Sequence, residues 1–143
     1  SKYFINQYFM PNIQLKLTDQ IKKFANTSID ISDGLLTDLD KMINTQKFSY
    51  KLYLNEIPIS NNLRKIIDLK KLSKVNYISN GDDYQVLFTA SKNKRRIIAK
   101  IATNFKIKLT KIGIIQSVGK KFSIVDHKNK EISLKNKGYF HQF

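Results

Sequence analysis

The stretch Ser28-Ile-Asp-Ile-Ser-Asp-Gly-Leu35 contains a change of hydrophobic period that decides how the chain folds. Up to residue 32 apolar and polar residues alternate, as they do in a strand with one buried face. This period of two directs the isoleucines into the core and points Asp30 and Ser32 the other way. Beyond Gly34 the apolar residues recur at helical spacing, which predicts a helix over about 33–46. We therefore expect a strand that runs directly into a helix.

Oxygen-bearing side chains gather at this junction between strand and helix. Asp33 falls at the mouth of the predicted helix, where Gly34 allows a close approach of the backbone. Asp30 and Asp33, with the Ser32 hydroxyl between them, suit Mg²⁺, which usually takes one or two carboxylates and completes its shell with water and phosphate. The hydroxyl and the N–H groups at the helix start can donate to a phosphate. The alternative is that Ser32 or Asp33 is only the helix N-cap.

Two further acids, Asp38 and Asp40, follow within the same predicted helix. Lys41 lies beside them, and alternating charges on a helix are typical of a face that contacts solvent. We therefore expect Asp38 and Asp40 to lie on a solvated face, outside the site.

A second acidic motif, Asn80-Gly-Asp-Asp-Tyr84, precedes the most hydrophobic segment of the chain. Residues 84–90 include Val86-Leu87-Phe88, which are apolar on both faces and favour a central strand. Polar groups at strand ends often line sites. Adjacent Asp residues in extended backbone face opposite ways, so we expect one to point to a site and the other to support the turn. A plain turn rich in Gly and Asp is the alternative.

The remaining patterns predict an α+β fold in which helices and strands alternate first and a β-rich end follows. An extended arm over 1–12 leads to a single domain over 13–143, which begins with an amphipathic helix over 13–25. Further predicted elements are a strand at Tyr50–Leu54, a short helix after Ser60, a helix capped by Ser91 with Ile97, Ile98, Ile101, Ala102 and Phe105 inside, and three short strands from Ile107 to Leu134. We expect a two-layer α/β sandwich with one mixed sheet.

Composition excludes several classes of protein. The 143 residues contain no Cys, which excludes a disulfide scaffold, a thiolate metal site and a Cys nucleophile. No apolar run is long enough for a membrane-spanning helix and no signal peptide is present, so we expect a cytoplasmic protein. The net charge of +15 raises the alternative of a basic nucleic-acid-binding module. Only three of the 26 basic residues are Arg, the usual reader of phosphate and guanine, which argues against that alternative.

Four stretches of the chain match the motifs of one known family, in the same order. Ile29-Asp-Ile-Ser-Asp-Gly-Leu-Leu-Thr-Asp-Leu39 is similar to its run IDxSDGLxxDL, and Gly81-Asp-Asp-Tyr-Gln-Val-Leu-Phe-Thr89 resembles GGEDYxLLFT. Lys111-Ile-Gly-Ile-Ile115 resembles the later strand xIGxI, and Gly138-Tyr-Phe-His-Gln-Phe143 resembles the terminal GYDHF. The chain thus resembles the C-terminal domain of the thiamine-monophosphate kinases. The same fold occurs in aminoimidazole ribonucleotide synthetase, selenophosphate synthetase and a hydrogenase-maturation protein.

The resemblance implies ATP-dependent phosphorylation of thiamine monophosphate to thiamine diphosphate by a Mg²⁺-dependent homodimer. By similarity, Asp30 and Asp33 would hold Mg²⁺ and Ser32 would contact the ATP phosphates. Asp82 stands in the place of the family's Glu and would contact the thiamine substrate, and Tyr139 would help to shape the substrate pocket. No residue is assigned as a general base, because a phosphate monoester is already a competent nucleophile. Another member of the same superfamily is the alternative enzyme.

The chain departs from the family pattern in its motifs and in its length. Asn80 replaces the first Gly of the usual pair, and Phe140 and Gln142 do not match the terminal motif. The family's N-terminal domain, which holds further metal-binding Asp residues and much of the ATP, has no counterpart here. The chain also begins at Ser1 without an initiator Met. We therefore expect a C-terminal half that folds alone and is inactive alone.

Overall fold

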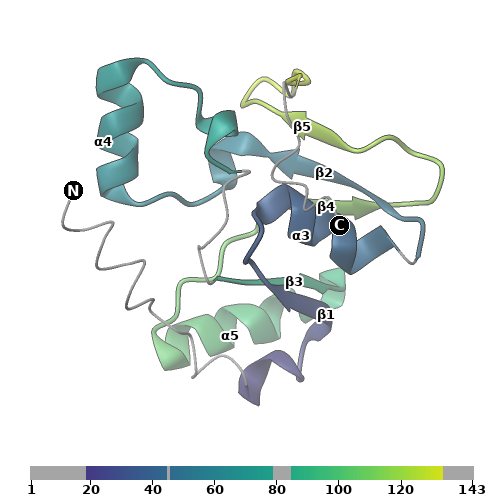
Figure 1. Cartoon of the computed structure of the whole chain (residues 1–143). Helices are drawn as coiled ribbons and strands as arrows, with labels where there is room; N and C mark the ends of the chain where they lie inside the picture. Colours follow the sequence, from purple (N-terminus) through teal and green to yellow (C-terminus); the bar gives the residue numbers. More distant parts are fainter. Residues whose placement is uncertain (1–18, 45, 79–84, 134–143) are drawn as a thin grey trace.

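The computed structural model of the chain describes residues 19–44, 46–78 and 85–133, which form a mixed α and β structure (Figure 1). The strands are β1 (Ala25–Asp30), β2 (Ser49–Tyr53), β3 (Val86–Ala90), β4 (Gly113–Gln116) and β5 (Ser123–Val125). The helices are α3 (Leu35–Asn44), α4 (Asn61–Lys70) and α5 (Arg95–Phe105), with short 3-10 turns at Leu54–Glu56, Lys74–Asn76 and Lys92–Lys94. No helix in these ranges is long and apolar enough to cross a membrane.

The predicted mixed sheet is confirmed, with β2 in its centre. Strand β2 pairs antiparallel with β4 and parallel with β5, so the order is β4-β2-β5. The described residues also contain a second, two-stranded antiparallel sheet of β1 and β3. The α+β class therefore holds, and the β1–β3 ladder is an addition to the single sheet that the patterns predicted.

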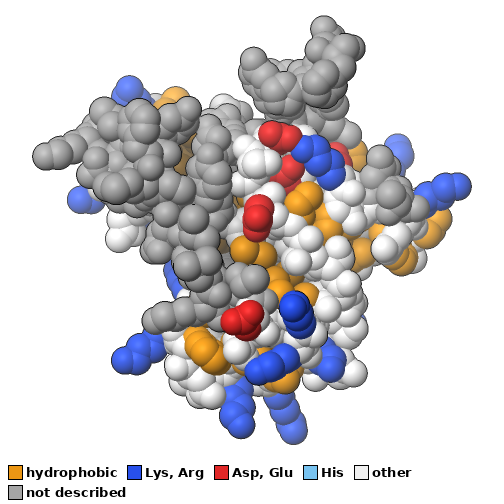
Figure 2. Space-filling model, turned by 60° about the horizontal axis from the view of Figure 1, so that its bottom comes forward, with side chains coloured by type: hydrophobic (Ala, Val, Ile, Leu, Met, Phe, Trp, Pro, Cys, Tyr) orange, Lys and Arg blue, Asp and Glu red, His pale blue; other side chains and the backbone are white. Residues whose placement is uncertain are grey.

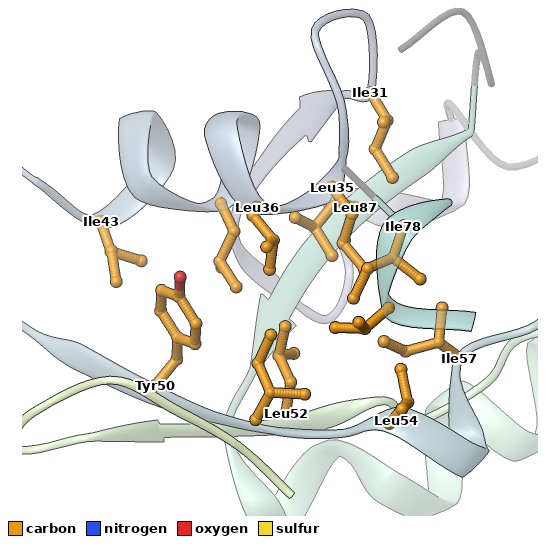
Figure 3. Close-up of a cluster of buried hydrophobic side chains, with 13 residues drawn as sticks. Ile31, Leu35, Leu36, Ile43, Tyr50, Leu52, Leu54, Ile57, Ile78 and Leu87 are labelled. Atoms are coloured by element: carbon orange, nitrogen blue, oxygen red, sulfur yellow. The ribbon is translucent and has the colours of Figure 1, made fainter. Parts of the chain in front are cut away.

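The main hydrophobic core lies between α3 and the mixed sheet. Figure 3 shows Tyr50, Leu52 and Leu54 projecting from β2 and its end toward side chains of α3. The other buried members of this core are Ile31, Leu35, Leu36, Leu39, Ile43, Ile57, Val75, Ile78, Leu87 and Ile124. Burial of these side chains, each contributing about 1.5–3 kcal/mol, fixes the strand–helix junction onto the mixed sheet.

Strand β3 is apolar on both faces because two different layers cover it. Leu87 belongs to the main core, whereas its neighbours Val86 and Phe88 pack with Phe24 and Ile101 in a second cluster. Figure 1 shows α3 on one side of the β1–β3 ladder and α5 on the other. The expectation of a central strand is wrong for the described residues, in which β3 pairs only with β1. Both faces are buried by helix packing, without a second neighbouring strand.

Several element boundaries differ from the predictions. Residues 19–21 are helical but β1 already begins at Ala25, inside the helix predicted over 13–25. The extended arm over 1–12 lies outside the described residues. Within residues 107–133, two strands and an isolated bridge between Val125 and Glu131 stand where three strands were predicted.

The two predicted helix caps have different outcomes. Ser60 caps α4 as expected, because its Oγ accepts a hydrogen bond from the Leu63 N–H at 3.1 Å. Ser91 makes no such bond. It precedes a 3-10 turn, and α5 begins only at Arg95, so the prediction of a Ser91 cap is wrong.

Gly113 in β4 is a position where the fold has no room for a side chain. A Cβ built there would lie 2.4 Å from the Lys51 backbone oxygen in β2 and 2.9 Å from the Leu52 side chain. Backbone atoms of a central strand cannot move aside without disturbing the ladder. This close approach of β4 to β2 explains the glycine of the Ile112-Gly-Ile motif physically.

We predict that Gly113→Ala lowers the free energy of unfolding by about 1–3 kcal/mol, as overpacking of a tight contact does. Urea denaturation monitored by circular dichroism measures the change. Ser117→Ala, at an exposed position just beyond the same strand, is the matched control and is expected to stay within about 0.5 kcal/mol of wild type. Equal stabilities for Gly113→Ala and wild type would show that β4 can move away from β2.

Candidate functional site

The junction between β1 and α3 has the side-chain alternation that the sequence predicts. Ile31 is buried in the main core and Ile29 packs against it, whereas Asp30 and Ser32 are exposed. Asp33 is partly exposed at the entrance to the helix. The buried isoleucines therefore anchor a loop that directs oxygen-bearing side chains outward.

Gly34 makes the sharp turn from this loop into α3. Its φ of 112° lies in a region that L-residues with a side chain rarely adopt. Helix α3 starts at the next residue, and the Asp38 N–H donates to the Gly34 carbonyl at 3.0 Å. The backbone conformation alone therefore favours glycine at this position.

Asp38 is the residue that holds the loop in place. Its side chain is only 1% exposed. One carboxylate oxygen, Oδ2, accepts hydrogen bonds from the backbone N–H groups of Ser32 at 2.8 Å and Asp33 at 2.9 Å. The expectation of a solvated Asp38 is wrong, because α3 turns this side chain inward beneath the loop.

Lys41 completes a charged cluster around Asp38. Its Nζ lies 3.1 Å from Asp38 Oδ1 and also forms an ion pair with Asp33 Oδ2. Burial raises the pKa of the Asp38 carboxyl, but the backbone hydrogen bonds from Asp33 and Ser32 and the contact with Lys41 outweigh it, so the pKa lies below its usual value. The Asp33 and Asp38 hydrogen bonds hold the pKa of Lys41 above its usual value. Asp38 is therefore ionised and paired at neutral pH.

Asp40 also differs from the expectation of a solvated acid. Burial raises the pKa of the Tyr50 hydroxyl, and the neighbouring Asp40 carboxylate and the hydrogen bond it accepts raise it further. Asp40 therefore contacts the edge of the main core and contributes to packing of α3 on β2.

The alternative that Ser32 or Asp33 is only the N-cap of α3 is wrong. In the part of the chain that the structure describes, neither Ser32 nor Asp33 caps α3 through its side chain; a residue of α3, Asp38, binds their N–H groups instead. The Leu35 N–H donates to the Ile78 carbonyl at 3.2 Å. The N–H groups of Ser32, Asp33 and Leu35 therefore have partners, and the expectation that they are free to bind phosphate is wrong. The exposed Ser32 hydroxyl is the donor that the loop presents to solvent.

Described residues on both sides of the second acidic motif are hydrogen-bonded to the first motif. Residues 79–84, which include Asp82, lie outside the described residues, as does Tyr139. Their two flanking residues are described: Ile78 accepts the hydrogen bond from Leu35, and the Gln85 carbonyl accepts one from the Ile31 N–H at 2.9 Å. Backbone hydrogen bonds thus hold both flanks of the second motif against the loop of the first.

The side chains at this loop fit a magnesium ion in chemical type. Asp30 and Asp33 present carboxylate oxygens, and Mg²⁺ commonly takes one or two carboxylates together with water and phosphate. Asp38 is not available, since both of its oxygens already accept hydrogen bonds. The ranges 19–44, 46–78 and 85–133 contain no group of three or more His, Cys, Asp or Glu side chains arranged for a metal. A cation here would therefore have two protein carboxylates at most from these ranges.

One face of the molecule has more basic than acidic side chains (Figure 2). Figure 2 shows Lys and Arg side chains projecting around the rim of one face, with a few acidic side chains between them. In a chain of net charge +15, such a setting attracts anions such as phosphates by its overall field.

Sequence reasoning missed Asp38 and Lys41. A signal for Asp38 was present, because it lies three residues after Leu35 and directly before Leu39, on the apolar stripe of α3. A buried carboxylate on such a stripe needs hydrogen-bond donors. The nearest unpaired donors are the N–H groups of the loop that precedes the helix. Lys41 carried no comparable signal among the many lysines of the chain.

The chain is similar in sequence to proteins named thiamine-monophosphate kinase. No protein-family model matches the chain. The chain is 34% identical over 140 residues to the thiamine-monophosphate kinase of Buchnera aphidicola subsp. Acyrthosiphon pisum, which covers 97% of this chain and 42% of that protein. The chain therefore spans less than half the length of this relative, in agreement with the resemblance to one domain.

Solved structures agree with this relationship. The thiamine-monophosphate kinase from Stenotrophomonas maltophilia K279a superposes with a TM-score of 0.75 at 26% identity, over 86% of this chain and 38% of that one. AaThiL complexed with AMPPCP and TMP superposes with a TM-score of 0.75 at 25% identity, over 99% of this chain and 41% of that one. The predicted fold and the predicted family resemblance are confirmed.

We predict that Asp38→Ala lowers the free energy of unfolding by about 2–3 kcal/mol, because two N–H groups of the loop lose their acceptor. Asp38→Asn is expected to lose less, since an amide oxygen can replace Oδ2. Urea denaturation at neutral pH measures both. Asp68→Ala, an exposed acid of α4, is the control and is expected to change little. A loss for Asp38→Ala no larger than for this control would contradict the bracing role.

Proposed function

We propose that this chain, a homologue of part of the thiamine-monophosphate kinases, forms the corresponding part of an enzyme that transfers a phosphoryl group from ATP to thiamine monophosphate. The similarity to a relative of that name extends over 97% of the chain. A related structure at a TM-score of 0.75 contains AMPPCP, an ATP analogue, together with TMP. The product would be thiamine diphosphate.

The observation that carries this proposal is the braced loop between β1 and α3. Asp30 and Ser32 are exposed there and Asp33 is partly exposed, while the buried Asp38 carboxylate accepts hydrogen bonds from the backbone N–H groups of Ser32 and Asp33. We assign Asp30 and Asp33 to Mg²⁺ and the Ser32 hydroxyl to a phosphate of ATP.

Asp82 and Tyr139 are proposed to contact the thiamine substrate. Support for Asp82 comes from its flanks, because Ile78 and Gln85 are hydrogen-bonded to the residues on either side of the loop. The substrate contact would then lie next to the metal and phosphate contacts. Tyr139 rests on the resemblance of the C-terminal motif alone.

Joining two phosphates requires charge neutralisation and positioning more than covalent chemistry. Mg²⁺, when bound, supplies neutralisation of the phosphate charge. Asp30 and Asp33 would orient the cation from a loop in which the backbone N–H groups of Ser32 and Asp33 are bonded to Asp38. The Ser32 hydroxyl would donate to a phosphate oxygen. No side chain of the loop needs to remove a proton, since the phosphate of thiamine monophosphate is already an anionic nucleophile.

The whole reaction is proposed to need more protein than this chain. The chain spans 42% of the length of the Buchnera relative, and the other part of that protein has no counterpart in these 143 residues. We propose a domain over 13–143 with an arm over 1–12, acting in a cytoplasmic homodimer. The 143-residue chain by itself is then expected to form no thiamine diphosphate.

We predict that Asp33→Asn in the full-length polypeptide lowers kcat for ATP-dependent formation of thiamine diphosphate by about 100-fold, because one carboxylate of the cation site is lost. Asp68→Asn on α4 is the matched control and is expected to keep wild-type kcat. Circular dichroism and the melting temperature check that both variants fold. Wild-type turnover by Asp33→Asn would remove the metal role of Asp33. A melting temperature that rises with aminoimidazole ribonucleotide and not with thiamine monophosphate would assign the chain to another enzyme of this fold.

A further inference from the structure

Lys41 occupies an unusual position for a lysine on a helix surface. Its ammonium contacts two carboxylates, Asp33 and Asp38, whose exposures are very different: the Asp33 side chain is 29% exposed and the Asp38 side chain 1%. Lys41 itself is 50% exposed. The lysine thus connects a buried, fixed acid to an outward-facing acid.

The two contacts of Lys41 differ in how firmly they are held. Asp38 cannot move, because its other oxygen accepts the two backbone N–H groups of the loop. Asp38 and Lys41 are also three residues apart on α3, where side chains are neighbours on the helix surface. Asp33 lies outside the helix and is reached across the loop. Lys41 can therefore leave Asp33 and still remain paired with Asp38.

Two cations at one carboxylate repel each other. For a divalent cation about 4 Å from an ammonium this repulsion amounts to about 8 kcal/mol at an effective dielectric constant of about 20, and to about 2 kcal/mol in bulk water. A divalent cation that binds Asp33 must therefore displace the Lys41 ammonium or bind against its charge. The same carboxylate serves both cations.

We propose that Lys41 is a built-in counter-cation of the Asp33 carboxylate, and that a divalent cation binds Asp33 in competition with it. Lys41 neutralises Asp33 when no divalent cation is bound and stays on Asp38 when one arrives. The inference rests on the proposed function in one respect, since it takes Asp33 as a metal-binding residue. It assigns to Lys41 a role in weakening the binding of bare divalent cations.

The test is Mn²⁺ binding to the 143-residue chain, with free Mn²⁺ counted by its electron paramagnetic resonance signal. Mn²⁺ prefers the same oxygen ligands as Mg²⁺. We expect Lys41→Met, which removes the charge and keeps the length of the side chain, to lower the Mn²⁺ dissociation constant about fivefold at low salt. The difference should shrink in high salt, because the repulsion is screened. Lys41→Arg keeps the charge and is expected to bind Mn²⁺ like wild type.

Two control variants separate this inference from the proposed function. Lys100→Met removes an exposed charge from α5, which packs on the opposite face of the β1–β3 ladder, and is expected to leave Mn²⁺ binding unchanged. Asp33→Asn is expected to abolish the binding. If Asp33→Asn binds Mn²⁺ as wild type does, the metal role of Asp33 in the proposed function is wrong. If neither wild type nor Lys41→Met binds Mn²⁺, competition by Lys41 in this chain is wrong, and the metal role is decided by the kcat of Asp33→Asn in the full-length polypeptide. If Asp33→Asn loses binding while Lys41→Met binds no more tightly than wild type, competition by Lys41 is wrong and the metal role remains.

A second measurement uses the wild-type chain and does not depend on folding of a variant. If Lys41 weakens the binding of a divalent cation to Asp33, then by linkage the bound cation weakens the Lys41–Asp33 ion pair to the same degree. We expect the side-chain ammonium ¹⁵N signal of Lys41 to change on addition of Mg²⁺, while that of Lys100 does not. An unchanged Lys41 signal at saturating Mg²⁺ would overturn the inference.

Discussion

The candidate site depends on one buried carboxylate. Asp38 lies in α3 with 1% of its side chain exposed, yet its hydrogen-bond partners belong to the loop that precedes the helix. A buried carboxylate is stable only where donors surround it, and two backbone N–H groups together with an ammonium meet that requirement here. Because Asp38 belongs to the packed helix α3, its hydrogen bonds fix the backbone of Ser32 and Asp33 as well. The exposed oxygen atoms of the loop are presented from a rigid base.

The layers of the fold supply the second constraint. The β1–β3 ladder lies between two apolar clusters, one under α3 and one under α5 (Figure 1). Ile31 extends β1 into the main core through its bond to Gln85, just before the chain turns at Gly34. The loop therefore has a buried residue on its strand side and a buried acid on its helix side. The phosphoryl transfer proposed for this site would benefit from such anchoring, because its catalysis is mostly positioning.

The chemistry proposed for the site agrees with the charges of the chain. A strongly basic protein attracts phosphates, and a small group of acids within it can hold a divalent cation that the phosphates bring or need. The chain is similar to the thiamine-monophosphate kinase of Buchnera over less than half of that protein's length. Lys41 belongs to both the basic and the acidic sets of side chains, because its ammonium pairs with the Asp33 and Asp38 carboxylates.

Local patterns in the sequence were sufficient for the strand–helix junction. Alternation through Asp30 and Ser32, and then helical spacing from Leu35, predicted both elements and the outward direction of the oxygen-bearing side chains. These features depend on neighbours in the chain, so periodicity reveals them. The family motifs added the expected fold. What only the tertiary structure decided depends on contacts between segments: that Asp38 turns inward to bind the loop, that α5 covers the second face of β3, and that Lys41 reaches Asp33. A helix pattern states which face is apolar, but the burial of a polar side chain on that face is determined by the donors that another segment brings to it.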